Sequence, residues 1–308
     1  MIKKIALGVA ALVALGIVVL NSQLQSANTE TSVLDAEARQ TAPGQFVELA
    51  DGLTHYELGG PESGQVVILV HGFSVPYYIW DTTFKALTNA GFRVVRYDTF
   101  GRGYSDRPEV DYDGALFERQ IIDLIYALDL ESPIDLIGLS MGGAVTMRFA
   151  ANNPELVQKI VLVDPTHEAW STPLFPEWIG SYVLALSLIP GLAEGQFADF
   201  LHPENYPFWA YRYRVQMQYE GFRRAIISTI YKFGPEDHLA NYRKVQELEL
   251  PVQLIWGVQD QTVDIAGADT VQSVLDVEYL PIDESGHLPH IEQAKVVNPA
   301  IIEFLLGT

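Results

Sequence analysis

The run Gly138-Leu139-Ser140-Met141-Gly142 places a serine two positions from a glycine on either side. It follows a β-branched strand pattern at 134–139 and precedes a helical pattern at 142–151. In this strand–turn–helix setting, a G-x-S-x-G run is typical of a nucleophile elbow, in which a strained turn exposes the serine hydroxyl. Small residues avoid a collision across the turn, and the N–H groups at the start of the helix favour developing negative charge. We therefore predict that Ser140 is a nucleophile.

A serine nucleophile needs a base to take its proton. His287 follows a predicted strand at 277–280, in the run Asp283-Glu284-Ser285-Gly286-His287. We predict that it is the base. His290, three residues later, is the alternative, and we expect it to pack or hydrogen-bond instead.

The base in turn needs an acid that orients it. Asp260 follows a predicted strand at 252–256 and is the predicted acid. Asp264 is the alternative, but it precedes the next helix, where a carboxylate has an ordinary structural role. The chain order is then Ser140, Asp260 and His287, that is, nucleophile, acid and base.

Acyl chemistry also requires hydrogen-bond donors for the developing oxyanion. The backbone N–H of Met141, directly after the nucleophile, is one predicted donor. The second comes from the loop after the predicted strand at 66–70, which reads His71-Gly72-Phe73-Ser74. We assign it to the backbone N–H of Phe73 and expect His71 to hold the loop in place by hydrogen bonds.

The elements that must position these groups alternate between strand and helix. A hairpin is predicted at 45–58, with its turn at Asp51-Gly52. Continuous apolar runs, typical of strands buried on both faces, follow at 66–70, 92–97, 134–139, 159–163, 252–256 and 277–280, with helical patterns at 116–128, 142–151 and 296–306. This alternation predicts an α/β fold with a mostly parallel central sheet flanked by helices.

Residues 166–241 interrupt the alternation, since they contain no clear buried strand and many aromatic side chains. We interpret them as an inserted α-helical cap on a core formed by 45–165 and 242–308. Most of the aromatic side chains should pack within the cap. We expect some of them to line a pocket, because ligands bind beyond the carboxyl ends of the strands in open α/β sheets.

Residues 1–20 have the composition of a targeting segment, with Lys3 and Lys4 before an uninterrupted apolar run at 5–20. Export as a periplasmic or secreted protein is expected, because such lysines stay on the cytoplasmic side. No small-x-small cleavage pair follows the run, so both a signal peptide and an N-terminal membrane anchor stay open. Residues 21–44 are polar and read as a linker.

Composition excludes several classes of protein. The formal charge of −20 over 308 residues repels phosphate backbones, so we expect no nucleic-acid partner. The absence of cysteine excludes disulfides, iron–sulfur clusters, thiolate zinc sites and a cysteine nucleophile. No clustered His/Asp/Glu set suggests a metal, and the chemistry above needs no cofactor.

These motifs resemble the α/β-hydrolase superfamily with a helical cap, over residues 46–306. The resemblance rests on His71-Gly72-Phe73, on Gly101-Arg102-Gly103-Tyr104-Ser105, on the Ser140 elbow, on Asp260 and on Gly286-His287. The chain looks most like the serine esterases and lipases of this superfamily. It differs from haloalkane dehalogenases and epoxide hydrolases, which carry aspartate at the position of Ser140.

The resemblance implies hydrolysis of a small apolar ester through an acyl-enzyme on Ser140, in the manner of esterases and monoacylglycerol lipases. Serine hydrolases of this fold also include C–C bond hydrolases, amidases and perhydrolases, which are alternatives. A non-catalytic ligand-binding protein is a further alternative, because a fold does not fix a function.

Overall fold

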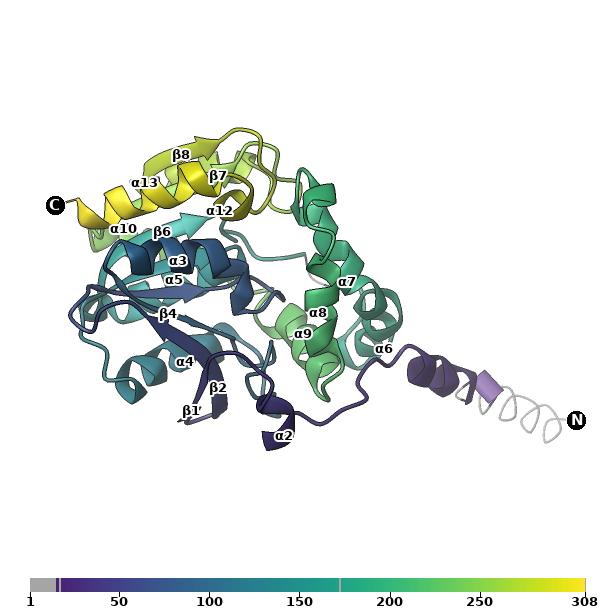
Figure 1. Cartoon of the computed structure of the whole chain (residues 1–308). Coiled ribbons are helices and arrows are strands. Elements are labelled where there is room, and N and C mark those ends of the chain that lie inside the picture. Colours follow the sequence, from purple (N-terminus) through teal and green to yellow (C-terminus); the bar gives the residue numbers. More distant parts are fainter. Residues whose placement is uncertain (1–14, 17, 172, 308) are drawn as a thin grey trace, which may run out of the picture.

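One mixed sheet forms the centre of the protein (Figure 1), in a computed structural model that describes residues 15–16, 18–171 and 173–307. Its strand order is β1-β2-β4-β3-β5-β6-β7-β8, with antiparallel pairing of β1, β2 and β4 and parallel pairing from β4 to β8. The strands are β1 (Gln45–Leu49), β2 (Gly52–Gly59), β3 (Val66–Val70), β4 (Arg93–Tyr97), β5 (Ile134–Leu139), β6 (Val157–Val163), β7 (Val252–Gly257) and β8 (Glu278–Ile282).

Helices cover both faces of this sheet, which explains the continuous apolar runs of its central strands. In β3 the side chains of Val66, Ile68 and Val70 enter one hydrophobic cluster, while Val67 and Leu69 enter the other. The first cluster includes side chains of α4 (Gly114–Ala127), α5 (Met141–Asn152), α10 (His238–Glu247) and α11 (Ala266–Gln272), and the second includes side chains of α3 (Asp81–Asn89) and α13 (Ala294–Leu306).

The predicted α/β fold with a mostly parallel sheet is therefore confirmed. One detail of the hairpin prediction is wrong by a residue. Leu49 pairs with Gly52, so the two-residue turn is Ala50-Asp51 rather than Asp51-Gly52. Gly52 itself begins β2, with a φ of +140°.

The inserted segment is helical, and it packs at one end of the sheet (Figure 1). Its elements are α6 (Glu177–Ser187), η3 (Ile189–Gly191), α7 (Leu192–Gly195), η4 (Gln196–Asp199), η5 (Pro203–Asn205), α8 (Trp209–Met217) and α9 (Phe222–Lys232). The helix α10 crosses the predicted cap boundary at residue 241 and packs against α5 of the core. Within the described residues, the stretch Glu177–Asp199 is apolar and long enough to cross a membrane by composition and length alone, and it forms part of this cap.

The predicted linker at 21–44 is docked on the cap. The backbone N–H groups of Thr31 and Ser32 both donate to the Gln218 carbonyl, at 2.8 and 3.0 Å. The Glu30 carboxylate accepts from the Arg223 N–H at 2.6 Å, and the short helix α2 (Ala36–Arg39) follows. Most of the predicted leader at 1–20 lies outside the described residues, and residues 18–26 are helical.

A buried carboxyl in the core gives a test of the packing. Asp135 on β5 lies opposite Lys159 on β6, is fully buried, and has no hydrogen-bond partner for either side-chain oxygen among the described residues. Burial raises its pKa to about 7, although the Lys159 charge opposes this rise. The folded state therefore holds the Asp135 proton more tightly than the unfolded state does. The stabilisation that this proton gives is present at low pH and is lost as the pH rises from the ordinary aspartate pKa to about 7.

We expect Asp135→Asn to change stability more favourably at pH 8.5 than at pH 5, by about 2 kcal/mol, because an amide cannot ionise in the core. Urea unfolding at both pH values measures this difference. The exposed Glu131→Gln is the control and should behave alike at both pH values. An Asp135→Asn effect that does not depend on pH would contradict the prediction.

Candidate active site

The predicted nucleophile lies in a strained turn between β5 and α5. Ser140 has φ 53° and ψ −121°, a left-handed backbone that a serine rarely adopts. Its N–H donates to the Val163 carbonyl at 3.0 Å, and its carbonyl accepts from the N–H groups of Gly143 and Thr166, both at 2.9 Å. These three bonds fix the turn to β6 and to α5, so the strain is held by the surrounding structure.

The glycines on either side of Ser140 are required by the close packing of this turn. A Cβ on Gly138 would lie 2.5 Å from the Gly142 carbonyl oxygen. A Cβ on Gly142 would lie 2.2 Å from the Val70 carbonyl oxygen, at the end of β3. The predicted collision across the elbow is thus present at Gly138, whereas at Gly142 the collision is with the backbone at the end of β3.

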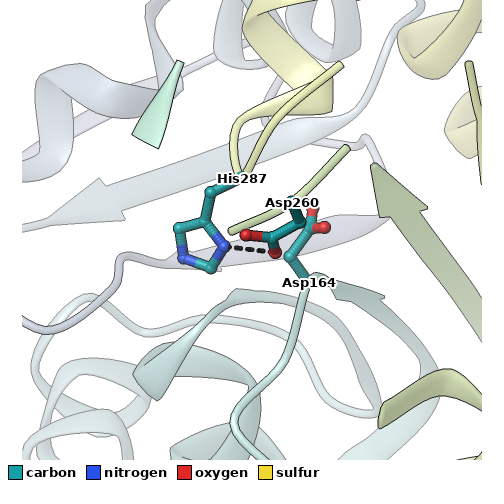
Figure 2. A group of neighbouring side chains, drawn as sticks. All are labelled: Asp164, Asp260 and His287. Carbon is teal, nitrogen blue, oxygen red and sulfur yellow. Dashed lines mark hydrogen bonds and ion pairs between the residues drawn. The ribbon is translucent and has the colours of Figure 1, made fainter. Parts of the chain in front are cut away.

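The predicted base and acid are in direct contact (Figure 2). His287 Nδ1 donates to Asp260 Oδ2 at 2.7 Å, and both side chains are almost completely buried. Burial alone would lower the pKa of His287. The charge and hydrogen bond of Asp260, together with the charge of Asp199, nevertheless raise its pKa above the ordinary value. The second ring nitrogen, Nε2, is left to face the pocket and to accept a proton.

The acid is held in place by its own loop. Asp260 Oδ1 accepts from the backbone N–H groups of Thr262 at 2.7 Å and Val263 at 3.0 Å. This leaves Oδ2 directed at His287, and the three hydrogen bonds together stabilise the carboxylate in its charged form.

A carboxylate latch, formed by Glu292 of α12 (Pro289–Glu292), joins the histidine loop to the cap. Its oxygens accept from the Gly286 N–H at 2.8 Å and from the N–H groups of Leu201 at 3.0 Å and His202 at 3.1 Å. The backbone N–H of His287 also donates to the backbone carbonyl of Asp199 at 2.8 Å. The return segment of the cap, residues 199–202, is therefore fixed to the loop that carries the base.

Ser140 and His287 line one small pocket of about 130 Å³. The rest of its wall is mostly apolar, with polar groups at the cap side; it comprises Gly72, Phe73, Ser74, Val75, Ile79, Leu139, Gln196, Asp199, Thr262 and Leu288. The expectation that some of the cap aromatics line a pocket is met, but not at Ser140, where none of them lies in the pocket wall. They line pockets elsewhere, including one of about 290 Å³ beside Tyr206 and Trp209.

The two predicted oxyanion donors lie next to this pocket. Met141 is the first residue of α5, and Phe73 belongs to the loop after β3. Within the described residues, neither backbone N–H donates a hydrogen bond to another group of the chain. A Cβ on Gly72 would lie 3.3 Å from the Ser140 Cβ, so a glycine allows this loop to approach the nucleophile closely.

The alternative residues have structural roles. His290 Nε2 donates to the Ile79 carbonyl at 3.1 Å, and burial lowers its pKa to about 3. Asp264 Oδ1 accepts from the Ala266 N–H at the start of α11. His71 donates from Nδ1 to the Gly72 carbonyl and accepts at Nε2 from the Thr99 N–H, as expected for a residue that holds the loop.

Two acids near the site were not predicted. Asp164 directly follows β6, and its side chain lies beside Asp260 (Figure 2). The argument that selected Asp260, an acid after a predicted strand, applies equally to Asp164 and could have found it. Asp199 lies on η4 and accepts from the Thr262 hydroxyl at 2.7 Å. Nothing in the sequence marks it, because the cap has no strand pattern that sets its register.

Asp164, Asp260 and His287 each offer an atom within 4.8 Å of the others, an arrangement that could hold a cation. Ligation would require both aspartates to be ionised and the His287–Asp260 hydrogen bond to be broken.

A larger pocket of about 690 Å³ lies between α6, α9 and residues 21–34, and it shares no lining residue with the Ser140 pocket.

Comparison with known proteins extends these observations. The model of the alpha/beta hydrolase family matches residues 67–300. The AB hydrolase superfamily protein YfhM of Bacillus subtilis is 29% identical over 282 residues, which cover 85% of this chain and 97% of that protein. Monoacylglycerol lipase ABHD6 of Homo sapiens is 26% identical over 269 residues, which cover 80% of this chain and 77% of that protein.

Among solved structures, a meta-cleavage product hydrolase from Pseudomonas fluorescens aligns with a TM-score of 0.71 at 24% identity, over 85% of this chain and 97% of that one. At this identity, the likeness concerns the fold. The family match, in contrast, spans well over half of the sequence and includes the elbow, the acid and the histidine loop. The chain belongs to the alpha/beta hydrolase family.

Proposed function

We propose that this protein is a serine hydrolase that cleaves small carboxylic esters through an acyl-enzyme on Ser140. The observation that carries the proposal is the buried His287–Asp260 hydrogen bond, because His287 lines the same pocket as a strained, half-buried serine. A histidine oriented by a carboxylate and placed near a serine is the arrangement that activates a hydroxyl for attack on a carbonyl.

In the proposed mechanism, Ser140 Oγ attacks the ester carbonyl carbon while His287 Nε2 takes its proton. Asp260 holds the ring and stabilises the imidazolium. The N–H groups of Phe73 and Met141 bind the oxyanion, and each such donor lowers the barrier by roughly 3 kcal/mol. The imidazolium then protonates the leaving alcohol. Water hydrolyses the acyl-enzyme by the same route, with His287 again acting as the base.

The pocket volume favours a short acyl group. A water molecule occupies about 30 Å³ in the liquid, so the pocket of about 130 Å³ accommodates roughly four or five non-hydrogen atoms. Its apolar wall, which includes Val75, Leu139 and Leu288, suits an alkyl chain. Similarity to a monoacylglycerol lipase supports the ester bond as the target, although the pocket favours shorter chains than a lipase name suggests.

The same triad could cleave other bonds, and C–C, amide and peracid chemistry stay as alternatives. A ladder of p-nitrophenyl esters from acetyl to palmitoyl separates the ester proposal from these. We expect kcat/KM to peak between acetyl and butyryl. Ser140→Ala should lower the peak value by about 10⁴-fold or more, because the nucleophile is lost.

Ser74→Ala is the matched control, since Ser74 lines the same pocket without a proposed role in the chemistry, and it should retain activity within tenfold. Slow, flat rates across the ladder would contradict the ester proposal. If a fluorophosphonate probe still labelled Ser140 in that case, the alternative bonds would come next.

The pKa of His287 predicts the pH profile. Because Asp260 and Asp199 raise this pKa above 6.5, kcat/KM should fall as pH drops through a value above 6.5. Asp199→Asn removes one of the two negative charges, which disfavours the imidazolium, so the acid limb should move to lower pH.

Asp264→Asn is the control for this prediction, because Asp264 is an exposed acid in the same loop region, where its carboxylate accepts from the Ala266 N–H. Its acid limb should coincide with that of the wild type. A limb that stays in place or moves to higher pH in Asp199→Asn would show that Asp199 does not act on the base.

The export expected from residues 1–20 is also part of the proposal. Its support is the pair Lys3 and Lys4 before the apolar run at 5–20. Cell fractionation should place the chain outside the cytoplasm, in the soluble fraction if the leader is cleaved and with membranes if it is retained. Deletion of residues 2–20 should leave the chain in the cytoplasm; export of the deletion variant would contradict a role of this segment.

A further inference from the structure

A second buried carboxyl, that of Asp164, lies beside the proposed catalytic acid Asp260, and the mechanism above does not use it. Asp164 follows β6 with a φ of 42°, is fully buried, and points towards Asp260 (Figure 2). Its Oδ1 accepts from the Gly257 N–H at 2.8 Å. Its Oδ2 has no hydrogen-bond partner among the described residues, and a carboxyl oxygen of Asp164 lies within 4.8 Å of ligand atoms of Asp260 and His287.

Two carboxylates this close cannot both be charged without a large electrostatic penalty, so one of them holds a proton. The hydrogen bonds decide which one. Asp260 accepts from two backbone N–H groups and from His287, whereas Asp164 accepts from one N–H. The negative charge therefore belongs on Asp260. The proton belongs on the oxygen of Asp164 that has no donor, where it has Asp260 as its acceptor.

We propose that Asp164 is a neutral carboxylic acid that donates its Oδ2–H to Asp260 and so acts as a positioning residue for the triad. The hydrogen bond adds a fourth donor to the Asp260 carboxylate. It ties the end of β6 to the loop after β7, while the Gly257 N–H ties the same side chain to β7 itself.

The surroundings of Asp164 agree with a neutral form. Burial and the Asp260 charge raise the pKa of Asp164 well above its ordinary value, with a smaller contribution from Glu292 on α12, and the Gly257 N–H opposes them. The other titratable groups nearby are His287, which Asp260 engages, and Tyr279 on β8. Among the described residues, no lysine or arginine forms an ion pair with Asp164, and the largest charge effects on it come from Asp260 and Glu292.

A neutral acid at this position orients Asp260 without adding a second negative charge beside His287. A second charge would raise the pKa of His287 further and leave more of the base protonated at neutral pH. This consequence for activity rests on the proposed function. The protonation state of Asp164 does not, so it can be tested without a substrate.

The first test uses the wild-type protein. Infrared spectra at pH 9 should contain the carbonyl band of a protonated carboxylic acid, and this band should disappear in Asp164→Asn. Asp135 does not interfere at pH 9, because its pKa is about 7. Absence of the band in the wild type would overturn the proposal, including the case in which an ionised Asp164 binds a cation.

The second test follows His287 by NMR titration of its ring protons, assigned by their loss in His287→Gln. Asn can accept from Gly257 and donate to Asp260 as a neutral Asp does, so Asp164→Asn should leave the acid dissociation constant of His287 within about twofold of the wild type. If Asp164 were ionised, the substitution would remove a charge from this site and increase that constant by about tenfold or more. That result would overturn the proposal.

The positioning role is tested by a pair of variants. Asp164→Asn should keep kcat/KM on the best p-nitrophenyl ester within about threefold. Asp164→Leu removes the donor to Asp260 and should lower kcat by about 10- to 100-fold with little change in KM. Equal losses in both variants would contradict positioning by the donated hydrogen bond. If Asp164→Leu does not fold, the infrared and NMR results still decide the protonation state.

Discussion

The hydrogen bond between His287 and Asp260 is the interaction on which the arrangement of this site depends. It joins the loops that follow β8 and β7, two neighbouring parallel strands, at a distance of 2.7 Å in a buried setting. Such a bond requires both strands to end at the same edge of the sheet, which parallel pairing ensures. The same edge carries the Ser140 elbow after β5 and the Phe73 loop after β3, so the sheet assembles one site from four separate segments.

The concentration of negative charge around this bond is unusual for a buried site. Asp260, Asp164 and Asp199 all lie near a single histidine, in a chain with a formal charge of −20. The three carboxyl groups can lie close together because each has different hydrogen-bond partners. Asp260 accepts three hydrogen bonds, Asp199 accepts from the Thr262 hydroxyl, and Asp164 holds a proton in our proposal. A network of this kind is stable when each member has a partner.

The fold and the predicted triad followed from the sequence because buried parallel strands have a continuous apolar pattern, and catalytic groups follow their ends. Ser140, Asp260 and His287 were predicted in this way, and the structure places His287 in contact with Asp260 and at the same pocket as Ser140. Asp199 was not predicted, because its position depends on how the cap folds back, and helical caps carry no comparable signal. The polar composition of residues 21–44 predicts a linker. Their docking on the cap could not be predicted, because it uses backbone hydrogen bonds to Gln218, which do not depend on the side chains of the segment.

The Glu292 latch has a consequence for how this enzyme family member can change its substrate range. Since residues 199–202 and the histidine loop share one carboxylate, a change in this part of the cap would also move His287, the proposed general base. The helix α8 has an attachment of its own, since the Gln216 amide donates to the carbonyl of Ser74 at 2.8 Å, and Ser74 lines the Ser140 pocket. Changes in the cap are therefore most restricted at residues 199–202 and at α8, two places where cap residues hold the loops around the Ser140 pocket.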